Sequence, residues 1–573
     1  MKNILVLTLC LLLDLIILKT NINSDIYIVA LLIDVLFILC ICSLIYLFKN
    51  SKKISIFIMS VFTLYCLSQN IYYLFFNSFY SLMNIANALD LSGIKINLLS
   101  KLKPDLLLYL LPVTVYLVYI NNNRKDNLSI DIRISRSSVL MGICLMILIN
   151  ILNPASIIAQ ELWSKEDLYN YLSMRNKAEF IEKFGIGSYI RKDIELTASD
   201  DSLNKDELNY WIDNNRELSE NNEYTDIFKD KNLIILQSES LSVNAIDENI
   251  TPNLFRLKNE GIFFSNFYAP LYPANTSDSE FIIQSSLIPS LNNGITCYEY
   301  GDNDFRETLP LLFKNKGYSV NSYHSYFENY YNRNNFHKAL GFDNYYGLES
   351  LFIDEKIKYE EEYWTDDYKL IEAYLNNRNS DKYYSLIITA SGHLPYDRSR
   401  AQLNDNYLKI KESYPEMNDE LAYYYASLMK YDDALGLLIN NLNENDVLVI
   451  VGDHYPYGLN AEAQSELMPS DYKKFKTPFI IYTKDIEHKE INKCCSTFDI
   501  LPTLANMFGF EIKEYHTGKD IFSENDSAVY FSDGSLIIND EYIDSGEEYL
   551  KHQDVYFYCQ EILKNMKKNQ SLK

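Results

Sequence analysis

The sequence predicts two parts: an α-helical membrane domain of about five transmembrane helices, followed by an α/β domain with a mostly parallel central sheet. Two observations lead to this prediction. Five apolar segments lie within the first 152 residues of the 573-residue chain. From residue 232 onward, short apolar runs rich in β-branched residues alternate with longer amphipathic stretches, a pattern typical of parallel strands connected by helices.

The apolar segments of the first part cover residues 4–18, 26–48, 54–76, 104–120 and 139–152. The second and third have the roughly 20 residues that a helix needs to cross a bilayer, whereas the other three need flanking residues. The first segment, with Lys2 before it, also fits a cleaved signal peptide, but the apolar segments behind it favour an anchored helix. Asp14 and Asp34 lie inside apolar segments, where a functional and a structural role are equally open.

Basic residues predict the orientation of these segments, because cytoplasmic loops are enriched in Lys and Arg. The stretches after the second and fourth segments carry Lys49, Lys52, Lys53, Arg124, Lys125, Arg133 and Arg136. Placing both in the cytoplasm puts the N-terminus inside the cell and the chain after residue 152 outside. Residues 77–103 then face outward despite Lys95, Lys101 and Lys103, and we interpret them as an interfacial helix.

The two parts differ in charge. Residues 1–160 carry 12 basic and 7 acidic side chains, whereas the rest of the chain carries 40 basic and 70 acidic ones. Such an acidic surface repels phosphates, which argues against nucleic-acid binding and against lying flat on an anionic bilayer. The nine cysteines include no CxxC pair, so neither a zinc ribbon nor a disulfide framework is indicated.

Composition also divides the chain along its length. We expect a transmembrane domain over residues 1–153, a polar helical linker over 154–231 with helical character around 162–184, and an extracellular domain over 232–565. This arrangement predicts a multi-pass protein of the cell membrane.

Three apolar runs of the last domain predict buried strands, at residues 233–236, 384–388 and 447–451. Residues 308–316 and 421–442 have the pattern of helices. Ligand sites in open parallel sheets form beyond the carboxyl ends of the strands. The polar residues that follow each run are therefore the candidates for a functional site.

Acidic and imidazole side chains follow all three predicted strands. Glu239 follows the first strand, and it fits either a metal ligand or an acid in the first turn of a helix. Asp453 and His454 follow the third strand directly after Gly452; such a mixed oxygen and nitrogen pair suits Zn or Mn, although a turn with an incidental histidine is equally open. His393 follows the second strand and fits a site residue or a loop histidine bonded to backbone.

The stretch "PANTSDSEF" (residues 273–281) contains a candidate nucleophile. A threonine hydroxyl such as that of Thr276 becomes reactive when a divalent cation lowers its pKa. Glu239, Asp453 and His454 could hold that cation, in a site built for attack on phosphorus or sulfur. We interpret Asp278 and Glu280 as capping or supporting acids at a helix start, with no metal role.

Several motifs together resemble one known family. "LIILQSES", "NTSDSEF", "YYNR", "TASGHLPY" and "VIVGDHY" occur in the order and rough spacing of the lipoteichoic acid synthase family. Its members are membrane-anchored, sulfatase-fold glycerophosphotransferases of the alkaline phosphatase superfamily. The resemblance covers about residues 232–522 and implies a sulfatase-like fold for the outer domain.

The resemblance also implies roles for particular residues. Glu239, Thr276, Asp453 and His454 match the Mn²⁺-binding set, for which Mg²⁺ and Zn²⁺ are alternatives. In the reaction that this implies, Thr276 attacks the phosphorus of phosphatidylglycerol, diacylglycerol leaves, and a hydroxyl of a growing polymer or glycolipid takes the glycerophosphate from the threonine. The implied substrate-binding residues are Tyr331, Arg333 and His393, with the arginine holding the phosphate and the histidine moving a proton.

Three positions depart from the pattern of the family. Tyr331 stands where tryptophan is usual, Tyr326 where an acidic residue is usual, and Asn275 where lysine is common. The metal chemistry is unaffected, but the head group and the product are left open. The family also implies a Gram-positive type of envelope.

Two other functions compete with this one. A phosphoethanolamine transferase acting on a surface glycan or lipid would use the same threonine and metal, but such enzymes commonly carry several disulfides in the outer domain. A non-catalytic envelope protein would not need all four metal-ligand positions. The sequence contains no (C/S)xPxR motif, which disfavours sulfate-ester hydrolysis, and it predicts neither the oligomeric state nor a primase or polymerase role.

Overall fold

The computed structural model describes residues 2–22, 27–45, 50–76, 79–81, 104–123, 132–156, 162–174, 176–198, 204–217, 220–291, 295–353, 366–378 and 382–566. They form two compact units. The N-terminal unit is Met1–Asp201 with Leu291–Gly294, and the C-terminal unit is Ser202–Ser290 with Ile295–Lys573. Most of the predicted interfacial helix, together with Lys49, Lys95, Lys101, Lys103, Arg124 and Lys125, lies outside the described residues.

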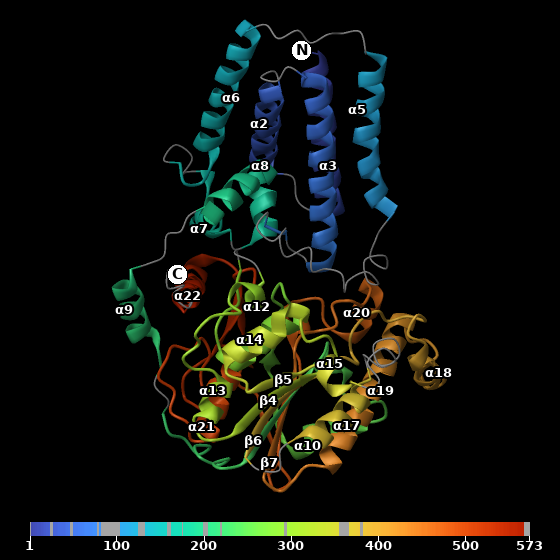
Figure 1. The fold of residues 1–573 in the computed structure, drawn as a ribbon, viewed down its shortest axis with the longest axis vertical. Coiled ribbons are helices and arrows are strands. Elements are labelled where there is room, and N and C mark those ends of the chain that lie inside the picture. Colours follow the sequence, from blue (N-terminus) through green and yellow to red (C-terminus); the bar gives the residue numbers. More distant parts are fainter. Residues whose placement is uncertain are drawn as a thin grey trace. The chain divides into compact units, whose positions relative to one another are not determined.

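The N-terminal unit is helical (Figure 1). Its elements are α1 (Lys2–Asn21), α2 (Ile28–Leu44), α3 (Ser51–Phe76), η4 (Pro104–Tyr109), α5 (Leu110–Asn122), α6 (Ile132–Leu152), α7 (Lys165–Ser173) and α8 (Lys177–Ala198). Among the described residues, Ser51–Leu74 and Pro104–Asn122 are long and apolar enough to cross a membrane, and Ile28–Ser43 and Leu140–Leu152 are shorter apolar helices. Two spans thus meet the criteria of length and hydropathy, and the five-helix membrane domain stays a prediction.

Both acidic residues of the apolar segments have partners in this unit. The Thr63 hydroxyl donates a hydrogen bond of 2.6 Å to Asp14, and Asp34 lies 3.6 Å from the Lys19 ammonium. Helix α8 is broken at Gly185, where φ is 79°, and a Cβ atom there would lie 2.5 Å from the Asp34 carboxylate. The Asp34 carboxylate is therefore packed against the break in α8.

The C-terminal unit contains a mixed eight-stranded sheet in the order β5-β4-β6-β1-β7-β8-β2-β9. The strands are β1 (Asn232–Ser238), β2 (Ile262–Phe264), β4 (Ser319–His324), β5 (Asn344–Tyr346), β6 (Tyr383–Ile388), β7 (Asp446–Gly452), β8 (Phe479–Tyr482) and β9 (Lys489–Ile491). The five strands from β5 to β7 are parallel, and β8 is antiparallel to both of its neighbours. The predicted α/β domain with a mostly parallel sheet is confirmed.

Burial on both faces explains why the three predicted strands are continuous apolar runs. Every residue of β1, β6 and β7 is buried, as expected for central parallel strands covered by helices. β1 lies between the other two, and its end is in register with both: Gln237 pairs with Ile388, and Ser238 pairs with Gly452. The carboxyl ends of the three strands therefore meet at one edge of the sheet.

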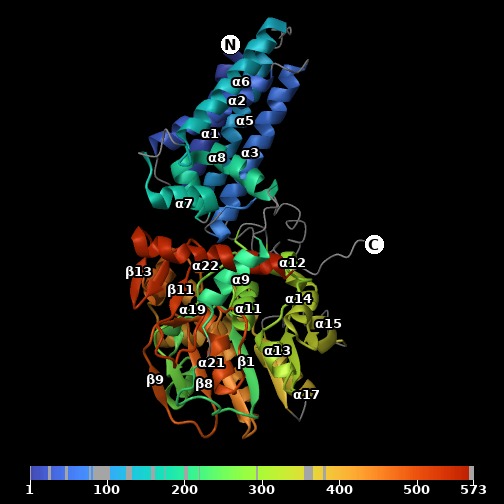
Figure 2. The same ribbon diagram turned by 90° about the vertical axis from the view of Figure 1, so that its left-hand side faces the viewer.

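Helices cover both faces of this sheet (Figures 1 and 2). One layer contains α10 (Pro252–Glu260), α17 (Asp367–Asn377), α18 (Asn404–Ser413), α19 (Asp419–Asn440) and α20 (Ala461–Leu467); the other contains α11 (Thr276–Ser285), α13 (Leu309–Lys314) and α21 (Ile500–Met507). α19 is the hub of the first layer, since all four of the other helices pack against it. Of these helices, α11, α17 and α19 reach the carboxyl ends of the strands.

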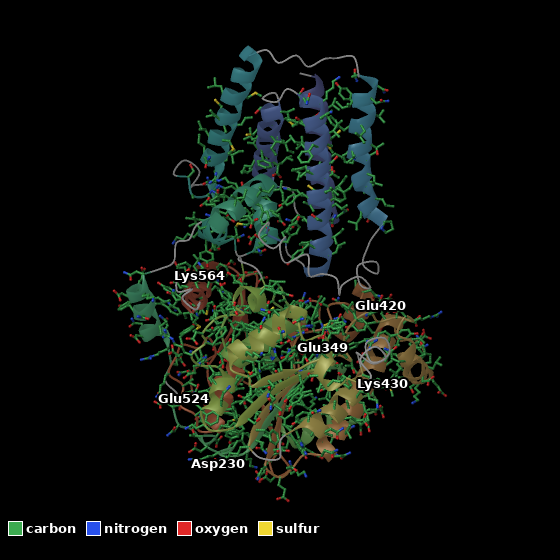
Figure 3. All side chains as sticks on the ribbon, in the orientation of Figure 1. Asp230, Glu349, Glu420, Lys430, Glu524 and Lys564 are labelled. Carbon is green, nitrogen blue, oxygen red and sulfur yellow. The ribbon has the colours of Figure 1, made fainter. Side chains whose placement is uncertain are left out.

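Smaller elements complete the unit. These are η6 (Val243–Ala245), β3 (Phe267–Tyr268), α12 (Thr296–Glu299), η7 (Tyr330–Asn332), α14 (Arg333–Leu340), α15 (Leu348–Leu351), η9 (Ala401–Leu403), η10 (Tyr472–Phe475), β10 (Cys495–Ser496), η11 (Thr497–Asp499), β11 (Ala528–Tyr530), β12 (Leu536–Ile538), β13 (Glu541–Ile543) and α22 (Gly546–Asn565). In the predicted linker, α9 (Lys205–Asn215) packs against α22, where Trp211 stacks on Tyr558 with ring centroids 4.3 Å apart. Acidic side chains such as Asp230 and Glu524 are exposed at the rim of the unit (Figure 3).

Candidate metal and nucleophile site

Three of the predicted site residues form one buried cluster at the ends of β1 and β7. Glu239, Asp453 and His454 each offer a ligand atom, and these atoms lie within 4.8 Å of one another. The His454 Nε2 atom is 3.7 Å from a Glu239 oxygen and 3.5 Å from Asp453 Oδ2. The strand-end expectation therefore placed these three residues together correctly.

The backbone around Glu239 is held by hydrogen bonds from three directions. Its N–H donates to the Thr389 hydroxyl at 3.0 Å. From α19, the Tyr424 hydroxyl donates to the Ser240 carbonyl at 2.8 Å, and the Tyr431 hydroxyl lies 2.7 Å from that of Ser238. The glutamate thus stands on a turn whose neighbours on both sides are fixed.

Asp453 has one saturated and one free oxygen. Its Oδ1 accepts the N–H groups of Ser240 and His454, both at 2.8 Å. Its Oδ2 is buried and has no hydrogen-bond partner among the described residues. Burial and the charge of Glu239 raise the pKa of Asp453 well above its usual range. A cation at this point would remove the cost of burying two carboxylates side by side.

The imidazole of His454 is set up as a neutral ligand. Its Nδ1 lies 3.0 Å from the Tyr455 carbonyl, and because a carbonyl only accepts, Nδ1 carries the proton and Nε2 presents its lone pair to the cluster. Burial lowers the pKa of His454, which favours this neutral form. Two carboxylates and a neutral imidazole are a donor set that fits a divalent cation such as Mn²⁺ or Zn²⁺.

Thr276 brings a hydroxyl to the same cluster. Its Oγ1 donates to Glu239 Oε2 at 2.8 Å and lies 3.5 Å from His454 Nε2. The threonine is the first residue of α11, so the positive end of the helix dipole favours a negative charge on its oxygen. The preceding residue, Asn275, has φ 47° and ψ −116°, a conformation that non-glycine residues rarely adopt. Its Nδ2 donates to the Tyr457 hydroxyl at 2.8 Å.

Arg333 begins α14 and is almost fully buried. Its Nε and Nη2 donate to the Glu280 carboxylate, with three N···O distances of 2.5 to 3.0 Å. Its Nη1 has no hydrogen-bond partner among the described residues. The half-buried Tyr331, with φ 57°, lies with its ring centroid 5.4 Å from the guanidinium carbon. The two predicted substrate-binding residues are therefore neighbours.

His393 lies in the loop after β6, as its position in the sequence predicts. Asp367 accepts the N–H groups of Ala390 and Ser391 at 2.8 and 2.9 Å, and Arg400 Nη1 donates to the His393 carbonyl at 2.7 Å. These bonds fix the loop. The imidazole Nδ1 lies 2.6 Å from the Leu394 carbonyl, and because a carbonyl only accepts, Nδ1 carries the proton and Nε2 keeps its lone pair.

Two residues of this region were missed or underrated in the sequence. His324 ends β4, and its Nδ1 lies 2.9 Å from the Ile388 carbonyl; burial and the charge of Arg333 lower its pKa to about 3, so it is neutral. β4 contains Ser319, Asn321 and Ser322 and does not look like a buried strand, but the strand-end rule would have found the histidine. Glu280, interpreted as a capping or supporting acid, is the partner of Arg333, which fits the supporting role.

Comparisons with known proteins show which proteins the chain resembles. The sulfatase family model matches residues 231–510. Lipoteichoic acid synthase 2 of Bacillus subtilis is 25% identical over 347 residues, which cover 55% of this chain and 51% of that protein. Lipoteichoic acid synthase of Staphylococcus aureus is 27% identical over 385 residues, which cover 61% and 56%. Residues 231–510 thus match the sulfatase family, and the chain is similar to members of the lipoteichoic acid synthase family.

Among solved structures, the lipoteichoic acid synthase LtaP from Listeria monocytogenes superposes with a TM-score of 0.51 at 22% identity, covering 62% of this chain and 97% of that one. This likeness confirms the sulfatase-type fold. The chain spans about half the length of these two curated relatives.

Proposed function

We propose that the chain is a divalent-metal-dependent phosphoglycerol transferase that carries glycerophosphate on Thr276. The observation that supports this most directly is the Thr276 hydroxyl, which donates to a buried carboxylate and lies 3.5 Å from a neutral imidazole nitrogen. The relatives are named lipoteichoic acid synthases. We therefore assign phosphatidylglycerol as the donor and a polyglycerolphosphate chain or related glycolipid as the acceptor.

The residues of the chain account for both half-reactions. In the first, the Thr276 oxygen bonds to phosphorus while its proton passes to Glu239, and the bond to diacylglycerol breaks. In the second, an acceptor hydroxyl bonds to phosphorus, the bond to Thr276 breaks, and the threonine recovers a proton. We assign proton transfer at the leaving and entering hydroxyls to His393, and the phosphate oxygens to the free edge of Arg333.

Glu239, Asp453, His454 and Thr276 would hold the metal, which we propose to be Mn²⁺. When bound, such a cation lowers the pKa of a coordinated hydroxyl and offsets the negative charge of the phosphate. The metal-ligand and nucleophile roles are proposals that the buried geometry of the cluster supports.

We also propose the membrane arrangement that the sequence indicates. Residues 1–153 would cross the membrane as five helices with the N-terminus in the cytoplasm, residues 154–231 would link the two parts, and residues 232–565 would catalyse at the outer face of a Gram-positive type of envelope. The two long apolar helices support a membrane location. Cysteine accessibility mapping in intact cells would test the topology.

The proposed activity is tested with Thr276→Ala in the purified full chain. Phosphatidylglycerol turnover in Mn²⁺ should fall at least about a thousandfold, because the nucleophile is lost. Ser277→Ala is the matched control, since it removes the adjacent buried hydroxyl and should keep most of the activity. Mass spectrometry of trapped wild-type protein should find a glycerophosphate adduct on Thr276, whereas an ethanolamine phosphate adduct would favour the competing transferase. Full turnover by Thr276→Ala would disprove the proposal.

A further inference from the structure

Glu280 and Arg333 form an ion pair that is closed to solvent. The exposed fractions of the two side chains are 0% and 2%, and they come from different elements, α11 and α14. Because Nε and Nη2 of the arginine both face the carboxylate, the guanidinium plane has a fixed orientation. A buried pair of this kind is costly unless the remaining polar atoms are satisfied.

The carboxylate of Glu280 is also bonded from its other side. His337 Nε2 lies 3.0 Å from Glu280 Oε2, and His337 Nδ1 lies 2.7 Å from the Ser322 hydroxyl. A carboxylate only accepts, so Nε2 carries the proton. Burial lowers the pKa of His337, so the ring is neutral and Nδ1 accepts from Ser322. Ser322 from β4 thus fixes His337, and His337 fixes Glu280.

One nitrogen of the Arg333 guanidinium does not take part in the ion pair. Arg333 Nη1 is buried and has no hydrogen-bond partner among the described residues, whereas Nε and Nη2 both donate to Glu280. The rings of Tyr330 and Tyr331 lie 6.0 and 5.4 Å from the guanidinium carbon. A buried donor without an acceptor is unfavourable in the free protein, which points to a ligand oxygen that accepts from it.

The charges of the ion pair, and of the cluster with a divalent cation bound, would cancel. Glu280 offsets Arg333, and the two carboxylates of Glu239 and Asp453 would offset a divalent cation. A phosphodiester adds one negative charge to such a site, whereas a phosphomonoester or inorganic phosphate adds nearly two at about pH 8. Each uncompensated charge is expensive in a buried site. A neutral surrounding therefore favours the singly charged ligand.

We propose that Glu280 is a positioning residue that aims the free edge of Arg333 at a phosphate oxygen and, by cancelling the charge of the arginine, makes the site select monoanionic phosphodiesters over phosphate dianions. This inference rests on the proposed function, since the intact lipid donor is a phosphodiester and glycerophosphate released by hydrolysis is a dianion. Glu280 would thereby protect the enzyme from inhibition by free phosphate.

The test measures the binding of two small anions to the full chain in detergent with Mn²⁺. Dimethyl phosphate is the monoanion and inorganic phosphate the dianion, and calorimetry gives a Kd for each. In Glu280→Gln, which keeps the shape but loses the charge, the ratio of the phosphate Kd to the dimethyl phosphate Kd should fall about tenfold. Asp446→Asn is the matched control, because Asp446 is a buried carboxylate beside Arg378 at the opposite end of β7, and its ratio should stay at the wild-type value.

A second variant separates charge from position. Glu280→Asp keeps the charge but shortens the side chain, so the binding ratio should stay within about twofold of wild type while kcat for phosphatidylglycerol falls about tenfold. The inference would be overturned if the ratio of the two Kd values were unchanged in Glu280→Gln or shifted equally in Asp446→Asn. Full phosphatidylglycerol turnover by Glu280→Asp would overturn it as well.

The same experiments separate this inference from the proposed function. If the wild type binds both anions and Glu280→Gln shifts the ratio, but no glycerophosphate is transferred, the charge selection holds and the proposed function fails. If transfer occurs and the Glu280 variants behave as wild type, only the inference fails. If the wild type binds neither anion, both fail.

Discussion

Replacing Asp453 by asparagine should stabilise the metal-free protein and destabilise the metal-bound one. Asp453 Oδ1 accepts two backbone N–H groups, and the side-chain oxygen of asparagine can accept the same two. The Oδ2 atom, which has no hydrogen-bond partner among the described residues, becomes an amide that can donate to Glu239. Because burial and the charge of Glu239 raise the pKa of Asp453, the metal-free wild type must either bury a like-charge pair or take up a proton at this site; the substitution removes that cost while keeping the backbone bonds.

The distances in the cluster set the size of the effect. The ligand atoms of Glu239 and Asp453 lie within 4.8 Å of each other, and two like charges at that distance repel by about 3 kcal/mol at an effective dielectric constant of about 20. For a domain of this size, about 1 kcal/mol corresponds to roughly 2 °C in Tm. Without metal, Asp453→Asn should therefore melt up to roughly 6 °C above wild type.

In the presence of Mn²⁺, the wild type should have a higher Tm than Asp453→Asn. Mn²⁺ at a hundredfold excess over its Kd should stabilise the wild type by about 2.7 kcal/mol, and it should leave the variant nearly unchanged because a ligand is missing. Thermal unfolding of the full chain in detergent, with EDTA and with Mn²⁺, measures both effects. A lower Tm of Asp453→Asn in EDTA, or an equal rise of both proteins in Mn²⁺, would refute the reasoning.

Two further predictions concern the loop after β6. A Cβ atom at Gly392 would lie 2.1 Å from the Glu239 carbonyl oxygen, so Gly392→Ala should displace the glutamate and lower kcat about a hundredfold; wild-type kcat would contradict this. Burial raises the pKa of Asp367 to about 6, against about 3.9 in an unfolded chain. A carboxyl with a raised folded pKa contributes stability below its unfolded pKa, and this is lost as pH rises through about 6. The free energy of unfolding of wild type relative to Asp367→Asn should therefore fall by about 2 kcal/mol between about pH 4 and pH 7, measured by urea titration at each pH, and a constant difference would count against the assignment.

The central part of the fold could be predicted because its sequence signals are local. β1, β6 and β7 are apolar runs because both faces of each strand are buried. β4 was missed because its serines and asparagine are satisfied by partners that only the fold supplies, such as His337 for Ser322. In the N-terminal unit, the helical character expected around residues 162–184 is confirmed by α7 and the first part of α8, which is broken at Gly185; the further helical stretch up to Ala198 was not predicted.

In the candidate site, too, some residues could be predicted from local sequence signals and others could not. Glu239, Asp453 and His454 could be grouped from the sequence because parallel strands end at one edge, and the rule needs no knowledge of side-chain packing. Glu280 could not be assigned, because its partner Arg333 lies 53 residues further along the chain and an acid in the first turns of a helix has an adequate local explanation. The roles of these residues in chemistry stay predictions until the variants are measured.

The position of β7 in the sheet determines when the candidate metal site can form during synthesis and folding. Ser240 and Asp453, which join the two halves of the cluster, are 213 residues apart, and β7 enters the sheet between β1 and β8. A nascent chain that has not yet delivered β7 has no complete set of ligands. The proposed metal would therefore be captured only after β7 has paired with β1, whereas β8 and β9, which follow in the chain, are not needed to complete the set of ligands.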